Sequence, residues 1–240
     1  MKNFLCCSMK RGFRGDASPV GRLILFLVLY WMCFQVPVMA QAVPFVGIQG
    51  GVATLSSDAR AVLTPQGLNT SVYTPANGPA INLFGGAHLT DYLSVQASYI
   101  WNSNNLILSS SSLISNTFYQ QSRTSSQSAF IVDFLVYFRR LNSRLRPYLA
   151  VGTGIDHFAS RQEQLKASGG TPILPPVRFS STHAVLHVPV GIDVALTHRV
   201  AFRYSFSETI RHNDIGGQLS PPGNRSLANF QNLFGIVFRF

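Results

Sequence analysis

Five charged residues lie on the polar faces of segments that alternate between apolar and polar positions. They are Asp133, Asp156, Asp193, Arg203 and Arg239. Asp193 and Arg203 stand five residues on either side of His198, the centre of a predicted tight turn, so we expect them to be direct cross-strand partners. Unpaired charges in a narrow interior are costly, which favours a structural network of ion pairs. The alternative is a proton or ion path along the same residues.

The remaining groups that could react or bind metal do not gather in the sequence. His183 and His187 are four residues apart, and on a strand this spacing separates them by about 13 Å. All three cysteines lie within the first 33 residues, so the rest of the chain has no disulfide or thiolate metal site. We therefore predict no catalytic, cofactor-binding or metal-binding residues, no cofactor and no enzymatic activity.

The elements that would position the charges are β-strands, because apolar and polar residues alternate with a period of two. The segment 230–240 shows the pattern most clearly, with Phe234, Ile236, Phe238 and Phe240 on one face and Arg239 on the other. Seven earlier segments repeat it. The eight predicted strands are 45–55, 81–89, 93–101, 129–138, 148–158, 183–196, 200–210 and 230–240.

The connections between these strands alternate between long and short. Four polar stretches, 56–79, 102–127, 160–181 and 211–229, are predicted as long loops, although 106–113 could extend a hairpin. An even strand number with this alternation is typical of transmembrane barrels. We predict an all-β fold, an eight-stranded antiparallel up-and-down transmembrane β-barrel over residues 43–240. Because proline removes a ladder donor, we also predict a local bulge at Pro189.

Composition and the N-terminal segment agree with an exported membrane protein. Charged residues make up only 12% of the 240, and after residue 42 no apolar run is long enough for a spanning helix. Despite the net charge of +10, no basic cluster suggests nucleic-acid binding. Residues 1–42 combine a basic start at Met1 or Met9, an apolar block at 23–38 and Ala40-Gln41-Ala42, which predicts a secretory signal peptide cleaved after Ala42. The alternative is an uncleaved membrane anchor.

Three motifs carry a resemblance to a known family. They are the run 146–154 (Arg-Pro-Tyr-Leu-Ala-Val-Gly-Thr-Gly), Gly191-Ile192-Asp193 and the terminal Phe238-Arg239-Phe240. With the signal, they resemble the small eight-stranded outer-membrane β-barrel proteins, the porin-like family that includes OmpA-type transmembrane domains. The resemblance implies that Phe234, Ile236, Phe238 and Phe240 form the signal read by the barrel-assembly machinery.

The resemblance also implies a location and partners. The protein is expected in the outer membrane of a Gram-negative-type bacterium as a monomer, in contact with outer-membrane lipid and without nucleic acid. Five loop bases are expected to be ordinary solvated charges, and contact with lipopolysaccharide phosphates is the alternative. These bases are Arg123, Arg161, Lys166, Arg178 and Arg211. The basic turn 139–146 is expected near the anionic headgroups of the inner leaflet.

The expected role is structural, or one of surface interaction, with a lumen plugged by side chains, since eight strands leave an interior only about wide enough for side chains. A small-solute channel is the first alternative. A lipid A-modifying hydrolase is the second, because His212-Asn213-Asp214 lies near Ser207, although Asp214 stands where related deacylases have a serine. The third is a soluble periplasmic barrel with a lipid-filled interior, in which the apolar faces would point inward.

Overall fold

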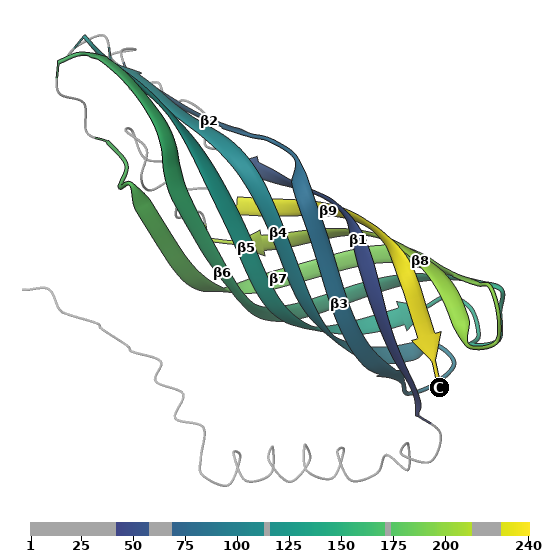
Figure 1. The fold of residues 1–240 in the computed structure, drawn as a ribbon. Helices are drawn as coiled ribbons and strands as arrows, with labels where there is room; N and C mark the ends of the chain where they lie inside the picture. Colours follow the sequence, from purple (N-terminus) through teal and green to yellow (C-terminus); the bar gives the residue numbers. More distant parts are fainter. Residues whose placement is uncertain (1–41, 58–68, 113–115, 171–173, 213–226) are drawn as a thin grey trace, which may run out of the picture. The chain divides into compact units, whose positions relative to one another are not determined.

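The computed structural model describes residues 42–57, 69–112, 116–170, 174–212 and 227–240. The predicted signal peptide, except Ala42, lies outside these residues. Figure 1 shows that the described part is a ring of strands. The strands are β1 (Val43–Ser57), β2 (Asn69–Pro75), β3 (Gly78–His88), β4 (Leu93–Ser112), β5 (Thr117–Tyr137), β6 (Leu145–Gly169), β7 (Arg178–Ala195), β8 (Val200–Arg211) and β9 (Leu227–Arg239).

The ring has eight positions and closes on itself. Sequential neighbours pair antiparallel from β3 to β9, and β1 pairs with both β3 and β9. The ninth strand, β2, pairs with the upper part of β4 while β3 pairs with the lower part, so β2 and β3 share one position. The predicted eight-stranded antiparallel up-and-down barrel is therefore confirmed.

Two of the short turns fix the register in the same way. Leu89 N donates to Leu93 O at 2.9 Å, and the hydroxyl of Thr90 accepts hydrogen bonds from two backbone amides inside that turn. Leu196 N donates to Val200 O at 2.9 Å, and Thr197 accepts in the same manner. In both turns the threonine hydroxyl accepts hydrogen bonds from backbone amides of the same turn. This fixes the register of the flanking strands, so that their apolar faces lie on the same side of the sheet.

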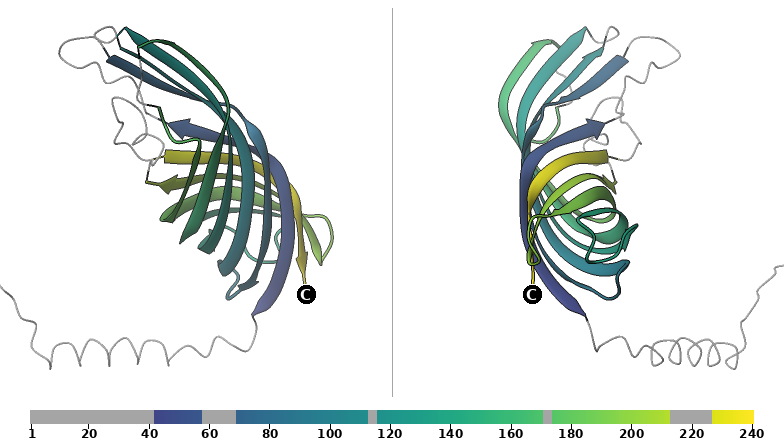
Figure 2. Two further views of the ribbon diagram at one scale, coloured as in Figure 1. Left: turned by 60° about the vertical axis from the view of Figure 1, so that its left-hand side comes forward. Right: turned by 90° about the vertical axis from the view of Figure 1, so that its right-hand side faces the viewer.

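Two of the four predicted long loops, 102–127 and 160–181, are largely strand, and a third contains a strand. β4 and β5 continue as one ladder up to the pair Ser112–Thr117, β6 runs to Gly169, and β2 lies within the stretch 56–79. The serine-rich composition was misleading because the outward positions here are polar, as on strands that face water. The paired segments 69–75, 103–112, 117–128 and 157–169 rise beyond the other strands, as the two views in Figure 2 show, and we call them the raised sheet.

The predicted bulge at Pro189 is wrong. The β6–β7 ladder pairs Leu149 with Val190 and Gly152 with His187, so the register is the same on both sides of the gap opposite Pro189. The missing proline N–H interrupts the ladder without shifting it. The register shifts instead in the raised sheet, where Ser122 pairs with Gln164 and Arg123 with Gln162, which leaves Glu163 as the extra residue.

Apolar side chains cover the outside of the lower ring. Phe130, Val151 and Ile155 are 53%, 53% and 60% exposed, whereas their chain neighbours Ile131, Ala150 and Asp156 are buried. The inner face is largely polar and closely packed. Outward apolar faces contradict the alternative of a barrel with a lipid-filled interior. Within the described ranges, no helix is long and apolar enough to cross a membrane.

We expect the outer apolar surface to lose stability when it receives a charge. Phe134 is 42% exposed at the middle of the apolar part of β5, and Thr124 lies ten residues away on the same face in the raised sheet. Phe134→Arg should lower the free energy of unfolding in lipid vesicles by about 2–4 kcal/mol. Thr124→Arg is the matched control and should change it little. Equal losses in denaturant titrations of the two variants would contradict a lipid-facing belt.

Candidate functional site

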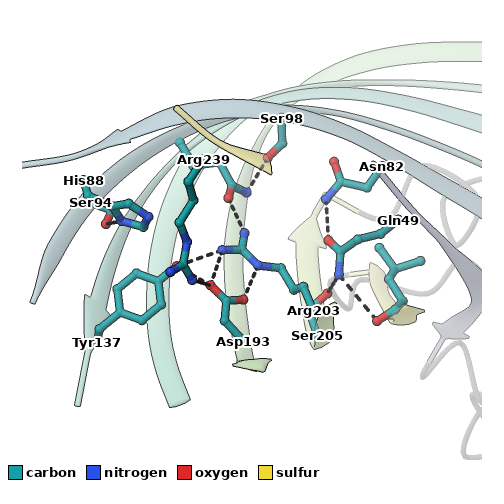
Figure 3. A network of polar contacts seen from close by, with 12 residues as sticks. Gln49, Asn82, His88, Ser94, Ser98, Tyr137, Asp193, Arg203, Ser205 and Arg239 are labelled. Atoms are coloured by element: carbon teal, nitrogen blue, oxygen red, sulfur yellow. Dashed lines mark hydrogen bonds and ion pairs between the residues drawn. The ribbon is translucent and has the colours of Figure 1, made fainter. Parts of the chain in front are cut away.

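The centre of the lumen is occupied by Arg203, which is held by acceptors on three strands (Figure 3). Its Nε donates to Asp193 Oδ1 at 2.6 Å and its Nη2 to Asp193 Oδ2 at 2.9 Å, which makes a bidentate pair. Nη1 donates to Gln96 Oε1 at 2.7 Å, and Nη2 also donates to Tyr137 Oη at 2.8 Å. Arg203 and Asp193 are each 1% exposed, so this charge pair is removed from bulk water.

Aromatic rings enclose this pair and fill the lower lumen. The guanidinium carbon of Arg203 lies 4.9 Å from the ring centroid of Phe84 and 5.0 Å from that of Tyr148. Such cation–ring contacts favour the charged form when water is excluded. Glycines make room for the rings, because a Cβ atom on Gly191 would stand 2.6 Å from Tyr148 Oη and one on Gly47 would overlap Phe84. Glycines on one strand thus leave the space that aromatic side chains from a neighbouring strand occupy.

The register of β7 and β8 explains why these charges meet. Asp193 is the direct cross-strand partner of Arg203, five residues on either side of the turn centred on His198. Arg239, from β9, reaches the same carboxylate with Nη2 at 3.9 Å from Asp193 Oδ2. Three of the five predicted lumen residues therefore lie together. Asp133 and Asp156 also face the lumen but belong to separate pairs.

Those separate pairs use partners that the sequence analysis did not assign. Asp133 Oδ1 lies 2.7 Å from His187 Nδ1, and Asp156 Oδ2 lies 3.0 Å from Arg211 Nη1. All four residues are buried. The sequence does indicate that His187 points into the lumen, because it shares the inward face of β7 with Asp193. Arg211 continues the parity of Arg203, so the same alternation identifies it as a lumen residue.

Three arginines lie elsewhere than predicted. Arg211 and Arg123 are 4% and 3% exposed and are not solvated loop bases. Arg146, predicted near lipid headgroups, is fully buried with its guanidinium 3.8 Å from the centroid of the Tyr137 ring. Its Nη2 donates to Asp91 O at 3.1 Å. The three arginines were predicted wrongly for one reason. The alternation of inward and outward side chains continues along the strands into segments that their composition alone assigns to turns or loops.

Neutral polar side chains close the lumen next to the charged pairs. Gln49 Nε2 donates to Ser205 Oγ at 2.9 Å, and Asn82 Nδ2 donates to Gln49 Oε1 at 3.4 Å. The cavity that these residues share with Asp133 and His187 has a volume of about 10 Å³. That is room for about one water molecule. At this level the lumen therefore contains no free space larger than about one water molecule.

Apolar residues fill other parts of the lumen, some of them at the level of the Asp156–Arg211 pair. Ile100, Ala129, Ile131 and Val185 form one buried cluster. A second cluster packs inside the raised sheet, with Phe179 against it; its buried members are Leu55, Leu106, Leu108, Tyr119 and Phe158. These clusters cover only part of the lumen wall, because the inner face of β8 stays polar from Arg203 to Arg211.

The residues behind the hydrolase alternative do not converge. Ser207 is buried in the lumen, 3.5 Å from Gln231 Oε1, while Glu208 occupies the opposite face of β8. His212 is five residues from Ser207, or about 16 Å along a strand, and its ring packs beside that of His183. Asn213 and Asp214 lie outside the described residues. Among the described residues, no three His, Cys, Asp or Glu side chains are grouped to hold a metal ion.

The four residues predicted as an assembly signal share the outer face of β9. Phe234, Ile236 and Phe238 are 52%, 40% and 44% exposed, and Phe240 follows at 75%. The backbone N–H of Phe240 donates to Pro44 O at 3.1 Å, so the end of β9 is bonded to the start of β1. The assembly role of these side chains stays a prediction.

We expect the Asp193–Arg203 pair to be a major source of barrel stability. Arg203→Met leaves a buried carboxylate without its main partner, and Asp193→Asn does the reverse, so each should lower the free energy of unfolding by about 3–5 kcal/mol. Denaturant midpoints in detergent or vesicles measure this loss. Replacing both residues, Arg203→Met with Asp193→Leu, should recover part of it.

Arg139 is the matched control, because it is an exposed arginine in the 139–146 turn. Arg139→Gln should leave the midpoint within about 0.5 kcal/mol of the wild-type value. Unchanged midpoints for both lumen variants would show that the pair does not stabilise the barrel.

Several solved structures are similar to this chain at low sequence identity. Ail of Yersinia pestis, in complex with the heparin analogue sucrose octasulfate, is 12% identical, with a TM-score of 0.47 over 83% of this chain and 99% of that chain. OprG of Pseudomonas aeruginosa is 16% identical, with a TM-score of 0.48 over 83% and 97%. Neisserial surface protein A is 13% identical, with a TM-score of 0.45 over 82% and 97%. No curated protein sequence matches significantly.

The family assignment comes from the sequence itself. Residues 26–238 match the family model described as outer membrane protein beta-barrel domain. This match covers most of the chain, and the eight-position ring is the architecture that the resemblance implied. The chain belongs to the outer-membrane β-barrel family, and it is a protein of the Gram-negative outer membrane.

Proposed function

We propose that this protein is a non-conducting barrel with a structural or surface-interaction role in the outer membrane, and that it has no catalytic activity. The observation that carries the proposal is the closed lumen. The bidentate Arg203–Asp193 pair spans the interior, and the neighbouring cavity of about 10 Å³ admits about one water molecule. A hydrated solute needs far more room than this.

The raised sheet supports the interactive part of the proposal. In outer-membrane barrels the short turns face the periplasm and the longer connections face outward. The turns at 90–92 and 197–199 are short, so we place them in the periplasm and the raised sheet outside the cell. Residues 1–42 are proposed to be the cleaved signal peptide and 43–240 the barrel, a monomer inserted by the barrel-assembly machinery.

Planar bilayer recordings separate this proposal from the small-solute channel. We expect no persistent openings from the purified protein at moderate voltage, because the layer beside Asp133 and His187 leaves room for about one water molecule. Insertion is verified by flotation of the protein with vesicles of the same lipid, and a general porin serves as the conducting control. Persistent single-channel steps from inserted protein would favour the channel and refute the plug.

The predicted assembly signal has its own test. Phe240→Asp removes the outward aromatic side chain while keeping the chain length, so we expect export to the periplasm but little insertion into the outer membrane. Phe240→Tyr keeps the ring and is the matched control. Cell fractionation with heat-modifiable gel mobility measures both variants. Normal insertion of the aspartate variant would remove Phe240 from the assembly signal.

A further inference from the structure

A cleft on the outer wall of the raised sheet carries an inference that rests on the proposed outward orientation. The cleft has a volume of about 500 Å³, and segments of β5, β6 and β7 line it. These strands are neighbours in the ring (Figure 1). Its lining includes Arg161, Arg178 and Glu163, together with serine and threonine side chains.

The two arginines form an unusual pair. Arg161 of β6 and Arg178 of β7 are direct cross-strand partners, both exposed. Like charges placed directly opposite each other destabilise a sheet. In the described part of the chain, no ion pair joins either arginine to Glu163 or to any other acid. An anion bound between the two guanidinium groups would remove this repulsion.

A third arginine, Arg123, contacts the backbone of the segment that carries Arg178. Arg123 is buried on the inner side of β5, and its Nε donates to Ser160 Oγ at 2.9 Å. Its Nη1 donates to Pro176 O at 2.9 Å, and its Nη2 lies 3.5 Å from Val177 O, so it holds the backbone just before Arg178. All its described acceptors are neutral, so its charge adds to the positive field of the cleft.

The height of the cleft indicates where an anion would come from. The continuous apolar belt on the outer faces of β5, β6 and β7 ends at Phe130, Ile155 and Leu186, and Phe118 stands alone farther along β5. Arg161 is six residues beyond Ile155, or about 20 Å along the strand and about 15 Å above the apolar belt after allowing for the strand tilt. In the proposed orientation this level is outside the hydrocarbon core on the cell-surface side, where the polar part of the surrounding lipopolysaccharide is expected.

We propose that this cleft binds a phosphate group on the saccharide part of lipopolysaccharide, with Arg161 and Arg178 as the two ligating side chains. Guanidinium groups bind phosphate through paired, charge-assisted hydrogen bonds. The outward direction of both arginines favours a lipid of the surrounding leaflet over a ligand that enters the lumen. Arg123 acts as a positioning residue for the segment that carries Arg178.

The test measures binding of fluorescent rough lipopolysaccharide to the full-length protein in phospholipid nanodiscs. The double variant Arg161→Gln/Arg178→Gln should bind at least about tenfold more weakly than the wild type. Arg139→Gln/Arg144→Gln, which removes two exposed arginines from the opposite end, is the matched control and should bind as the wild type does. Chemically dephosphorylated lipopolysaccharide should bind the wild type as weakly as the intact form binds the double variant.

A charge reversal separates ligand binding from structure. Arg178→Glu places a carboxylate opposite Arg161, so the denaturant midpoint should be unchanged or higher while lipopolysaccharide binding is lost. Equal binding by the wild type and the double variant would overturn the inference. Competition by inorganic phosphate at equimolar concentration would assign the cleft to free phosphate instead, and tighter binding of heparin would assign it to a sulfated polysaccharide. Each result is independent of whether the barrel conducts.

Discussion

The interior of this barrel is governed by the cost of burying charge in a space that only side chains can fill. An eight-position ring is too narrow for bulk water, so each buried charge needs a partner that the strand register brings within reach. Asp193 and Arg203 meet because the Thr197 turn makes them cross-strand partners, and the other buried aspartates are paired across the lumen. The same side chains that satisfy the charges also fill the lumen, so the stability of the barrel and its proposed impermeability have one physical origin.

The inner and outer faces of each strand lie in different environments. The environment of the outer face also changes along the barrel, which divides the molecule into a lower apolar zone and an upper polar zone. Below the level of Phe130 and Ile155 the outer face meets lipid and is apolar, whereas above it the outer face is mostly serine, threonine and arginine, with Ile107 and Phe118 as exceptions. The inner face is packed in both zones, but it changes from largely polar in the lower ring to an apolar cluster with Leu106, Leu108 and Tyr119 in the raised sheet. A wall with a packed inside and a polar outside is suited to contact with saccharides and proteins at the cell surface.

The alternation that lipid imposes is the reason that so much of the fold was predictable. Within the belt every second residue must be apolar, so strand position, parity and the Asp193–Arg203 pairing follow from sequence. In the raised sheet the outer face meets water, and polar residues such as Ser122, Ser126 and Thr124 look like loop residues. The sequence did not predict the partners of Asp133 and Asp156. These partners lie on strands that are not direct neighbours, and the register of neighbouring strands gives no distance between such residues.

The buried side chains of the lumen carry more positive than negative charge. Five buried arginines accompany three buried aspartates, an excess of two positive charges among the described residues, apart from the histidines. Arg146, Arg203 and Arg239 all lie around Asp193, so the excess is concentrated near the end of the barrel where β9 finishes. An uncompensated field of this sign in a low-dielectric interior repels cations strongly. In the proposed non-conducting barrel, cations and protons are therefore opposed in two ways, by side chains that fill the lumen and by electrostatic repulsion, which argues against a proton path through this network.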